Sequence, residues 1–463
     1  MVGHAGSVVD QLAAARDDVH TGAQQLAADV GGLRPGQRLD AGMDLRQRDL
    51  GVFDRDVEAQ RVGAAQFGPH ARRRDQRFRG NAVPQHAGPA DAVAVDDGDL
   101  GDLTTAGRGE LVDDTPGMAH HRVKVTTNDG KVGTLKADVV LIATGASPRV
   151  LPGAVPDGER VLNWRQLYEL TELPEHLVIV GSGVTGAEFC NAYTELGVKV
   201  TVVASRDQIL PHEDSDAAAV LEDAFNERGV SLVKNARAES VSRDAHGVVV
   251  TMTDGRTVTG SHALMTVGSV PNTSGLGLEK AGIELGSGNY IPVDRVSRTS
   301  ASGIYAAGDC TGLLPLASVA AMQGRIAMYH ALGEGVSPIR LRTVAAAVFT
   351  RPEIAAVGVP QSKIDDGTVP ARTIMLPLTT NARAKMSLLR RGFVKIFCRP
   401  ATGVVIGGVV VAPIASELIL PIALAVQNNL TVTDLAETFS VYPSLSGSLT
   451  EAGRRLMAHD DLD

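Results

Sequence analysis

Short continuous apolar runs separated by polar turns mark the chain from residue 109 onward, a pattern typical of strands buried inside a sheet. The apolar run at residues 137–143 is typical of a strand covered on both faces. A second buried run at residues 177–180 and a third at residues 199–203 are also expected to be strands. A helix is expected at residues 187–196, between the second and third runs. A strand, a helix and another strand within about 30 residues form a βαβ unit, which predicts a parallel sheet and an α/β fold.

The remaining pattern extends this body on both sides. The turn Asn128-Asp129-Gly130, between residues 123–127 and 134–136, predicts a hairpin. Further strands are expected at residues 247–253, 257–267 and 304–307, and helices at 163–170 and 318–332. Near the C-terminus, expected strands alternate with amphipathic helices and predict a separate α+β domain; the strands are 345–349, 372–378, 393–398 and 404–411, and the helices 415–428 and 433–439.

Residues 1–108 have a different composition. They contain 15 Asp and 13 Arg but one Glu, and no Lys, Ile, Tyr, Trp or Cys. With so few large apolar residues, the segment cannot bury enough surface to offset the entropy of ordering it. We therefore expect a disordered arm, with one amphipathic helix over residues 8–30 as the alternative.

Composition and charge exclude several classes of protein. The length of 463 residues suggests about three domains, and the net charge of −9 argues against a nucleic-acid-binding protein. Three distant cysteines without a C-x-x-C pair favour neither a disulfide scaffold nor a metal site. The most apolar stretch, residues 404–427, is interrupted by Pro413, Glu417 and Pro421, so no membrane span is expected. Without a signal peptide, a cytoplasmic protein is expected.

A glycine motif carries the clearest functional signal. The sequence Gly181-Ser182-Gly183-Val184-Thr185-Gly186 follows one buried run and opens a helix. In a dinucleotide-binding turn, the first glycine permits the tight turn, the second lets the pyrophosphate approach, and the third lets helix and strand pack closely. We therefore predict an NAD(P)H site here.

The end of the next strand bears on the choice between NADH and NADPH. An acidic residue there would bind the ribose hydroxyls of NAD, but the position holds Ala204, followed by Ser205 and Arg206. Ser205 and Arg206 either bind the 2′-phosphate of NADPH or are solvated. Asp207 lies further along the chain than the position of the expected acidic residue.

Residues 107–463 resemble the flavoprotein disulfide reductase family, also called pyridine nucleotide-disulfide oxidoreductases, to which dihydrolipoamide dehydrogenase belongs. The resemblance is carried by Ala143-Thr144-Gly145, by the glycine run ending at Glu188, by Gly268–Asn272 and by the I-Y-A-A-G-D run ending at Asp309.

The resemblance implies two Rossmann-like nucleotide-binding domains, the first of them incomplete, and a C-terminal α+β dimerisation domain. Residues 109–170 and 271–340 would be the remaining parts of the FAD domain. Residues 171–270 would bind NAD(P)H, and residues 341–463 would form the homodimer, with 1–108 unassigned.

The resemblance also implies which residues bind the cofactors. Those expected to bind FAD are Thr144, Gly145, Asp309, Pro315, Leu316, Ala317 and Ser318. Those expected to bind NAD(P)H are the six residues 181–186 with Glu188, Ser205, Arg206 and Gly268.

Two departures from the family change the expected chemistry. Tyr442 and Gly447 stand where the disulfide enzymes have a His and a Glu, and a phenol with a pKa of about 10 is a poor base at neutral pH. The redox pair C-x-x-x-x-C is also absent, so buried, inert thiols are expected and no catalytic residue is assigned.

The pattern is similar to the branch of the family that passes electrons from NAD(P)H through FAD to a quinone. A dihydrolipoamide dehydrogenase is one alternative, and a non-catalytic nucleotide-binding dimer is another. Arg383 and Lys385 either line the approach of the acceptor or belong to a solvated loop.

A third departure concerns the start of the family's pattern. Members begin with a strand and a G-x-G-x-x-G motif for the FAD pyrophosphate, and residues 1–106 contain neither. We hypothesise that this segment is read in a shifted frame, because its composition resembles a wrong-frame reading of GC-rich DNA. A replacement domain is the rival explanation. Translating the upstream DNA in the other frames would decide between them. If none of the frames contained a strand followed by the glycine motif, the shifted-frame hypothesis would be refuted.

Overall fold

The computed structural model describes residues 107–112 and 120–457. The expectations for residues 1–106 lie outside this part of the chain. Gly107 and Arg108, which were counted with the disordered arm, are instead the start of strand β1 (Gly107–Leu111). They pair with Thr127 and Thr126 of β2 (His121–Thr127), so antiparallel hydrogen bonding, which the composition does not reveal, orders them.

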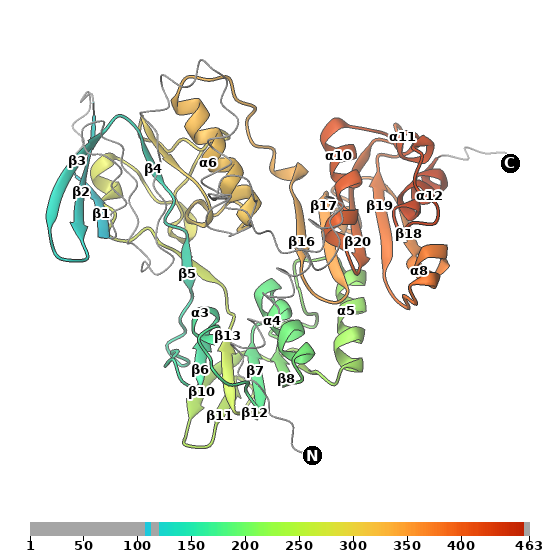
Figure 1. Cartoon of the computed structure of the whole chain (residues 1–463), viewed down its shortest axis with the longest axis horizontal. Helices are drawn as coiled ribbons and strands as arrows, with labels where there is room; N and C mark the ends of the chain where they lie inside the picture. Colours follow the sequence, from blue (N-terminus) through green and yellow to red (C-terminus); the bar gives the residue numbers. More distant parts are fainter. Residues whose placement is uncertain (1–106, 113–119, 458–463) are drawn as a thin grey trace, which may run out of the picture.

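A five-stranded parallel sheet forms the lower lobe in Figure 1. Its order is β6-β13-β7-β8-β9, with bounds Val161–Asn163, His262–Met265, His176–Val180, Lys199–Val203 and Ser231–Val233. Helix α4 (Val184–Glu195) joins β7 to β8, which confirms the predicted βαβ unit. Because β6 pairs with β13, this sheet includes residues ahead of position 171.

One expectation for this lobe was wrong, and one helix was not predicted. The run 257–267 is two strands in different sheets, because β12 (Thr257–Gly260) pairs with β11 (Val248–Met252) and β13 pairs with β7. Helix α5 (Ser215–Glu227) was missed. Its buried face consists of three alanines, Leu221 and Phe225, which recur at helical spacing. The remaining strand of the small antiparallel sheet is β10 (Ala238–Arg243).

The upper left lobe combines an antiparallel meander, β1-β2-β3, with a short parallel pair, β4-β15 (Figure 1). The predicted hairpin is confirmed by β2 and β3 (Val132–Ala137). The run 137–143 is not one doubly buried strand. It divides into the end of β3 and β4 (Val140–Ile142), and Leu141 is half-buried. Among the described strands only β15 (Ile304–Ala306) pairs with β4, so one edge of that pair stays open.

Helices and a two-stranded ribbon complete this lobe. Helix α6 (Ala317–Ala331) packs on β15. The ribbon of β5 (Ala146–Pro148) and β14 (Ser269–Pro271) carries the chain between this lobe and the parallel sheet. In the parallel-sheet lobe, helix α3 (Trp164–Leu167) follows β6 and is shorter than predicted. The 3-10 turns are η3 (Leu278–Ala281), η4 (Ser287–Asn289) and η5 (Asp309–Thr311).

The C-terminal lobe is a five-stranded antiparallel sheet covered by helices. Its order is β16-β17-β20-β19-β18, with bounds Ala345–Val348, Glu353–Gly358, Val405–Ala412, Phe393–Cys398 and Arg372–Pro377. The predicted helix 415–428 is two helices, α9 (Ala415–Leu418) and α10 (Leu420–Asn428), with Pro421 in the first turn of the second. The other elements are η6 (Leu341–Thr343), α7 (Gln361–Asp365), η7 (Leu378–Thr380), α8 (Ala382–Met386), α11 (Val432–Glu437) and α12 (Gly447–Leu456).

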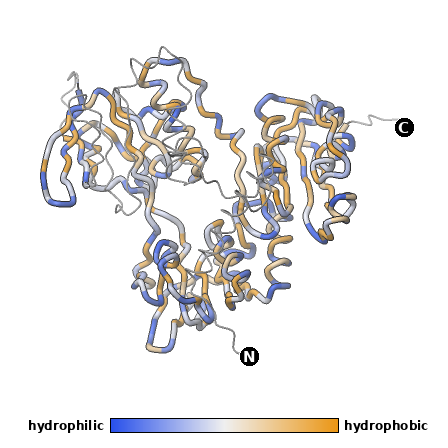
Figure 2. The backbone as a smooth tube through the Cα atoms, viewed as in Figure 1, coloured by the Kyte–Doolittle hydropathy of each residue, from blue (hydrophilic) through white to orange (hydrophobic). Residues whose placement is uncertain are grey.

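One apolar core continues from the parallel sheet into the C-terminal lobe. Leu177 and Phe225 belong to the same buried cluster as Val348, Phe397 and Val409. In Figure 2 the strands of both lobes are largely hydrophobic, and the hydrophilic segments, drawn in blue, lie mainly at the turns. The two lobes are therefore held against each other by buried apolar surface.

Candidate functional site

The glycine turn between β7 and α4 has the geometry of a nucleotide-binding loop. Gly181 has a φ of 115°, which favours glycine. A Cβ on Gly186 would lie 2.1 Å from the backbone oxygen of Gly181, so only glycine lets the helix pack this closely on the loop. A Cβ on Gly183 would meet nothing within 4 Å, which leaves open space where a pyrophosphate would approach.

Helix α4 starts directly after this turn, three residues earlier than predicted. Val184 and Thr185 therefore lie in its exposed first turn, where amide groups point out of the helix end. Ser182 is buried, and its carbonyl accepts a hydrogen bond from the amide of Leu210. The helix dipole and these amides suit a phosphate group.

Thr266 supports the turn and was missed by sequence reasoning. Its hydroxyl donates to the carbonyls of Val180 (3.0 Å) and Gly181 (3.1 Å), from the residue just after β13. No local motif announces this role, because the contact depends on β13 pairing beside β7.

Ser205 and Arg206 are exposed just beyond the end of β8, at the same edge of the sheet as the glycine turn. Ala204, at the position of the expected acid, is fully buried. The carbonyl of Arg206 accepts from the amide of Asn235 (3.0 Å), and the carbonyl of Asn235 accepts from the Arg256 guanidinium (3.0 Å). Arg206 and Arg256 therefore bring two guanidinium groups near this loop, of which Arg256 is paired with Asp254 (2.7 Å).

The residues expected to bind FAD come together at the ends of β4 and β15. Gly145 has a φ of 65°, and a Cβ there would meet nothing within 4 Å. The Thr144 hydroxyl donates to the carbonyl of Asn272 (2.6 Å), and the Asn272 side chain donates back to the carbonyl of Thr144 (2.8 Å). Thr144 therefore ties the two chain segments of this lobe together.

Asp309 lies at the start of η5, directly after β15. Burial raises the pKa of its carboxyl group. Gln323 of α6 is fully buried and was missed by sequence reasoning. Its side-chain oxygen accepts from the amide of Gly308 (2.9 Å), and its amide group donates to the Thr311 hydroxyl (3.3 Å). This glutamine holds the loop that carries Asp309.

The structure distributes the other expected site residues as follows. Pro315, Ala317 and Ser318 are exposed around the start of α6, and Leu316 is its N-cap. Gly268 is exposed at the ribbon, with a φ of 95°.

One carboxylate oxygen of Glu188 accepts a hydrogen bond from the amide of Phe349 (2.9 Å) in the C-terminal lobe. Burial raises the pKa of Glu188, and the bond from Phe349 opposes this shift.

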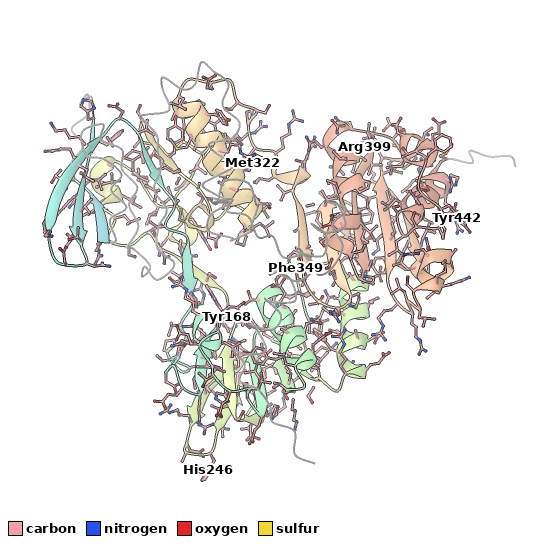
Figure 3. All side chains as sticks on the ribbon, viewed as in Figure 1. Tyr168, His246, Met322, Phe349, Arg399 and Tyr442 are labelled. Atoms are coloured by element: carbon pink, nitrogen blue, oxygen red, sulfur yellow. The ribbon has the colours of Figure 1, made fainter. Side chains whose placement is uncertain are left out.

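The three thiols are buried and unbonded to one another, as predicted. Burial raises the pKa of Cys190 to about 12 and also raises those of Cys310 and Cys398. Tyr442 is 85% exposed at the outer edge of the C-terminal lobe (Figure 3), and Gly447 starts α12. Because the three thiols are not paired with one another, they form no disulfide that could take part in dithiol chemistry.

These residues fit a nicotinamide dinucleotide at the glycine turn, since the space above Gly183 is open and the helix end is exposed. They fit the flavin and ribityl side of FAD around Gly145 and Asp309. Within residues 107–112 and 120–457, the turn at 181–186 is the one strand–glycine–helix motif of this kind, so the FAD pyrophosphate has no equivalent loop there.

Comparison with known proteins defines the class. The family model for pyridine nucleotide-disulphide oxidoreductases matches residues 110–324, and the model for the dimerisation domain of these enzymes matches residues 344–453. The chain therefore belongs to this family of flavoprotein oxidoreductases, whose members use FAD and NAD(P)H, as the sequence analysis predicted.

Two curated relatives illustrate the range of the family. The chain is 78% identical over 364 residues to a Mycobacterium tuberculosis protein named NAD(P)H dehydrogenase (quinone), covering 79% of this chain and 74% of the relative. It is 33% identical over 340 residues to the dihydrolipoyl dehydrogenase of Chlamydia pneumoniae, covering 73% and 71%.

Solved structures agree with the fold. LpdA from Mycobacterium tuberculosis matches with a TM-score of 0.73 and 78% identity, over 76% of this chain and 77% of that one. The flavoprotein disulfide reductase RclA from Escherichia coli matches with a TM-score of 0.67 and 26% identity, over 75% and 78%. Among the described helices, none is long and apolar enough to span a membrane.

Proposed function

We propose that the protein transfers a hydride from NAD(P)H to FAD and passes the electrons on to a quinone. The observation that carries this proposal is the combination of an intact glycine turn with three buried, unpaired thiols. Electrons that enter from the nicotinamide then have no dithiol to reach, and an acceptor that reacts at the flavin itself is required. The name of the 78%-identical relative supports a quinone in that role.

The protein's own residues would bind and orient the cofactors. The turn 181–186 and the first turn of α4 would hold the pyrophosphate of NAD(P)H. Gly145 and Asp309 would face the flavin side, with Gln323 holding the Asp309 loop in place. Bound FAD supplies the hydride-accepting and electron-donating chemistry. Tyr442 is not needed as a proton donor or acceptor in this scheme.

Two residues argue against the activity of a dihydrolipoyl dehydrogenase. Tyr442 replaces the family His, and Gly447 replaces the Glu. Purified protein that oxidises NADPH with a benzoquinone, but not with lipoamide, would support the quinone reductase; lipoamide turnover would refute it.

A nucleotide-binding dimer without flavin is the second candidate, favoured by the single glycine turn in the described residues. The visible spectrum of the purified chain separates the two. Flavin bands near one FAD per chain support the reductase, whereas a colourless protein that binds NADPH supports the second candidate.

A homodimer fits the exposed apolar side chains of the C-terminal lobe. Phe439 is 102% exposed and Val441 77% exposed, next to Tyr442. Side chains of this size are usually buried, so a second copy of the lobe is the natural cover. A cytoplasmic homodimer is part of the proposal, and its mass in solution tests the dimer.

Arg206 provides a test of cofactor choice. If its guanidinium binds the 2′-phosphate, Arg206→Ala should weaken NADPH binding about tenfold, through loss of a charge-assisted hydrogen bond, and leave NADH binding unchanged. Titration calorimetry with both nucleotides measures this. Arg256→Ala is the neighbouring control. Equal effects of Arg206→Ala on both nucleotides would show that the side chain is merely solvated.

A further inference from the structure

The nucleotide-binding helix α4 presents one polar face to the C-terminal lobe. Glu188, Asn191 and Glu195 are spaced three and four residues apart, so they lie on the same side of the helix. All three bind the turn between β16 and β17, which contains Phe349, Arg351 and Pro352. Phe349 lies where the two lobes meet (Figure 3).

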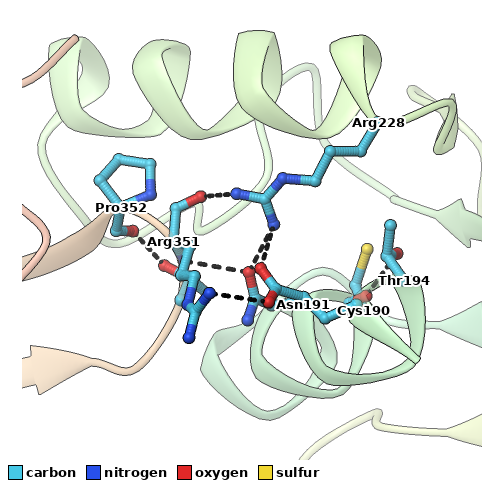
Figure 4. Close-up of polar contacts among 8 residues, drawn as sticks. Cys190, Asn191, Thr194, Arg228, Arg351 and Pro352 are labelled. Carbon is cyan, nitrogen blue, oxygen red and sulfur yellow. Dashed lines mark hydrogen bonds and ion pairs between the residues drawn. The ribbon is translucent and has the colours of Figure 1, made fainter. Parts of the chain in front are cut away.

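Asn191 is the centre of these contacts. Its side-chain oxygen accepts hydrogen bonds from the amide of Arg351 (3.0 Å) and from the Arg228 guanidinium (2.8 Å). Figure 4 shows Asn191 between these two arginines. One oxygen atom thus joins α4 both to the C-cap of α5 and to the C-terminal lobe.

The two arginines complete the connection. Arg228 also binds the Glu195 carboxylate (3.2 Å) and donates to the carbonyl of Arg351. The Arg351 guanidinium binds the other Glu195 oxygen (3.1 Å). The four residues that share these bonds are called the interdomain clamp below: Asn191, Glu195, Arg228 and Arg351.

The clamp is one of several connections between the two lobes. The apolar cluster that includes Phe225, Phe397 and Val409 already joins the two lobes. Such apolar contacts are non-directional, whereas hydrogen bonds shared between two arginines, an amide and a carboxylate define an orientation. The clamp therefore acts on the angle of α4 rather than on whether the lobes associate.

That angle matters because α4 begins at the glycine turn. Gly186 of the helix packs directly against the backbone of Gly181, so the helix and the turn are closely joined. A rotation of the helix therefore moves any nucleotide bound at its end. A displacement of about 1 Å at the reacting atoms can slow a reaction about a hundredfold.

We propose that Asn191 and Arg228 are positioning residues, which orient α4 through the interdomain clamp so that NAD(P)H is held at the correct distance from the flavin. This inference rests on the proposed function in that it takes the glycine turn to bind NAD(P)H. None of the four clamp residues belongs to the glycine turn or to the residues expected to bind FAD. The clamp should affect the rate of hydride transfer far more than the affinity for the nucleotide.

A pair of substitutions at one position tests this directly. Asn191→Asp keeps an oxygen that accepts both bonds, whereas Asn191→Leu has a similar size and no acceptor. In stopped-flow reduction of the flavoprotein by NADPH, Asn191→Leu and Arg228→Ala should lower the limiting rate about ten- to a hundredfold. The NADPH dissociation constant should stay at the wild-type value, and Asn191→Asp should be close to wild type.

Arg243→Ala is the matched control, because Arg243 pairs with Asp157 and Glu159 within the same lobe and makes no contact with the clamp. It should leave both the rate and the affinity unchanged. A normal limiting rate in Asn191→Leu, or an Asn191→Asp variant as slow as Asn191→Leu, would overturn the proposal.

Hydrogen exchange gives a second measurement that needs no flavin. The amides of Phe349 and Arg351 donate into Glu188 and Asn191. With NADPH bound, the Arg351 amide should exchange faster in Asn191→Leu than in wild type or Asn191→Asp. Unchanged exchange would refute the clamp even if the chain binds no flavin. Failure of the proposed function itself would be seen separately, as a colourless wild-type protein.

Discussion

Replacing Gly186 with alanine should lower stability by about 3 kcal/mol and abolish NADPH binding at concentrations that saturate the wild-type protein. The added Cβ would lie 2.1 Å from the carbonyl oxygen of Gly181 and 3.0 Å from the Thr266 hydroxyl. The nearest of these atoms belongs to the backbone of the turn and cannot move aside as the end of a flexible side chain could. The helix end must therefore shift away from the turn that it shares with the nucleotide site. Urea unfolding and titration calorimetry measure the two effects.

Gly183→Ala is the control for this prediction. Its Cβ would meet nothing within 4 Å in the protein, so stability should be unchanged. The methyl group would instead occupy the space where the pyrophosphate approaches, and binding alone should weaken. If Gly183→Ala bound NADPH as tightly as wild type, the nucleotide would not lie over this turn.

The second large effect is expected at Lys395, in the middle of β19. Its ammonium group is 2% exposed and binds Asp214 (2.7 Å) and Asp216 (2.6 Å) of the parallel-sheet lobe. Asp214 is 3% exposed, so Lys395→Met would leave a buried carboxylate without its cation. Removing one partner of a buried ion pair costs about 3–5 kcal/mol. Urea unfolding of Lys395→Met should show a loss of this size.

A double variant identifies the cause of that loss. Asp214 is also the N-cap of α5, where its side chain accepts from the amide of Ala217. Serine keeps that cap without the charge. Lys395→Met combined with Asp214→Ser should therefore recover most of the lost stability. Asp216→Asn, at a 55% exposed carboxylate, should have little effect. If the double variant were as unstable as Lys395→Met, lost packing of the lysine chain would be the cause.

The sequence predicted those elements whose signals are local. The βαβ unit around 181–186 was correct because a buried run, three glycines and a helix occur within one short segment. The strand 393–398 was correct to the residue, since an apolar run predicts a strand without reference to its partners. Helix α5 was missed although its apolar residues recur at helical spacing. Residues 257–267 were merged although Gly260 and Ser261 interrupt the apolar pattern; that the two halves join different sheets depends on their partners β11 and β7, which a local pattern does not specify.

In the candidate site too, residues with a local sequence signal were identified and residues that act through distant partners were not. Gly181, Gly183 and Gly186 were identified from spacing. The structure explains Gly181 by its φ angle, Gly186 by the close approach of the helix to the loop, and Gly183 by the open space beside it. Thr266 and Gln323 were not identified, because each acts through backbone groups far away in the sequence. Glu188 was expected to bind the nucleotide, yet its carboxylate accepts from the Phe349 amide, 161 residues away.

The sequence by itself determined the family, the nucleotide turn and the absence of a redox disulfide, because these depend on residue identity at short spacing. Only the tertiary structure decided how the nucleotide-binding lobe is held. Lys395 and Asp214 are 181 residues apart, and Asn191 and Arg351 are 160 apart. Such pairs leave no periodic pattern in the chain. Their energies arise only when folding brings the groups within hydrogen-bonding distance and removes the water between them.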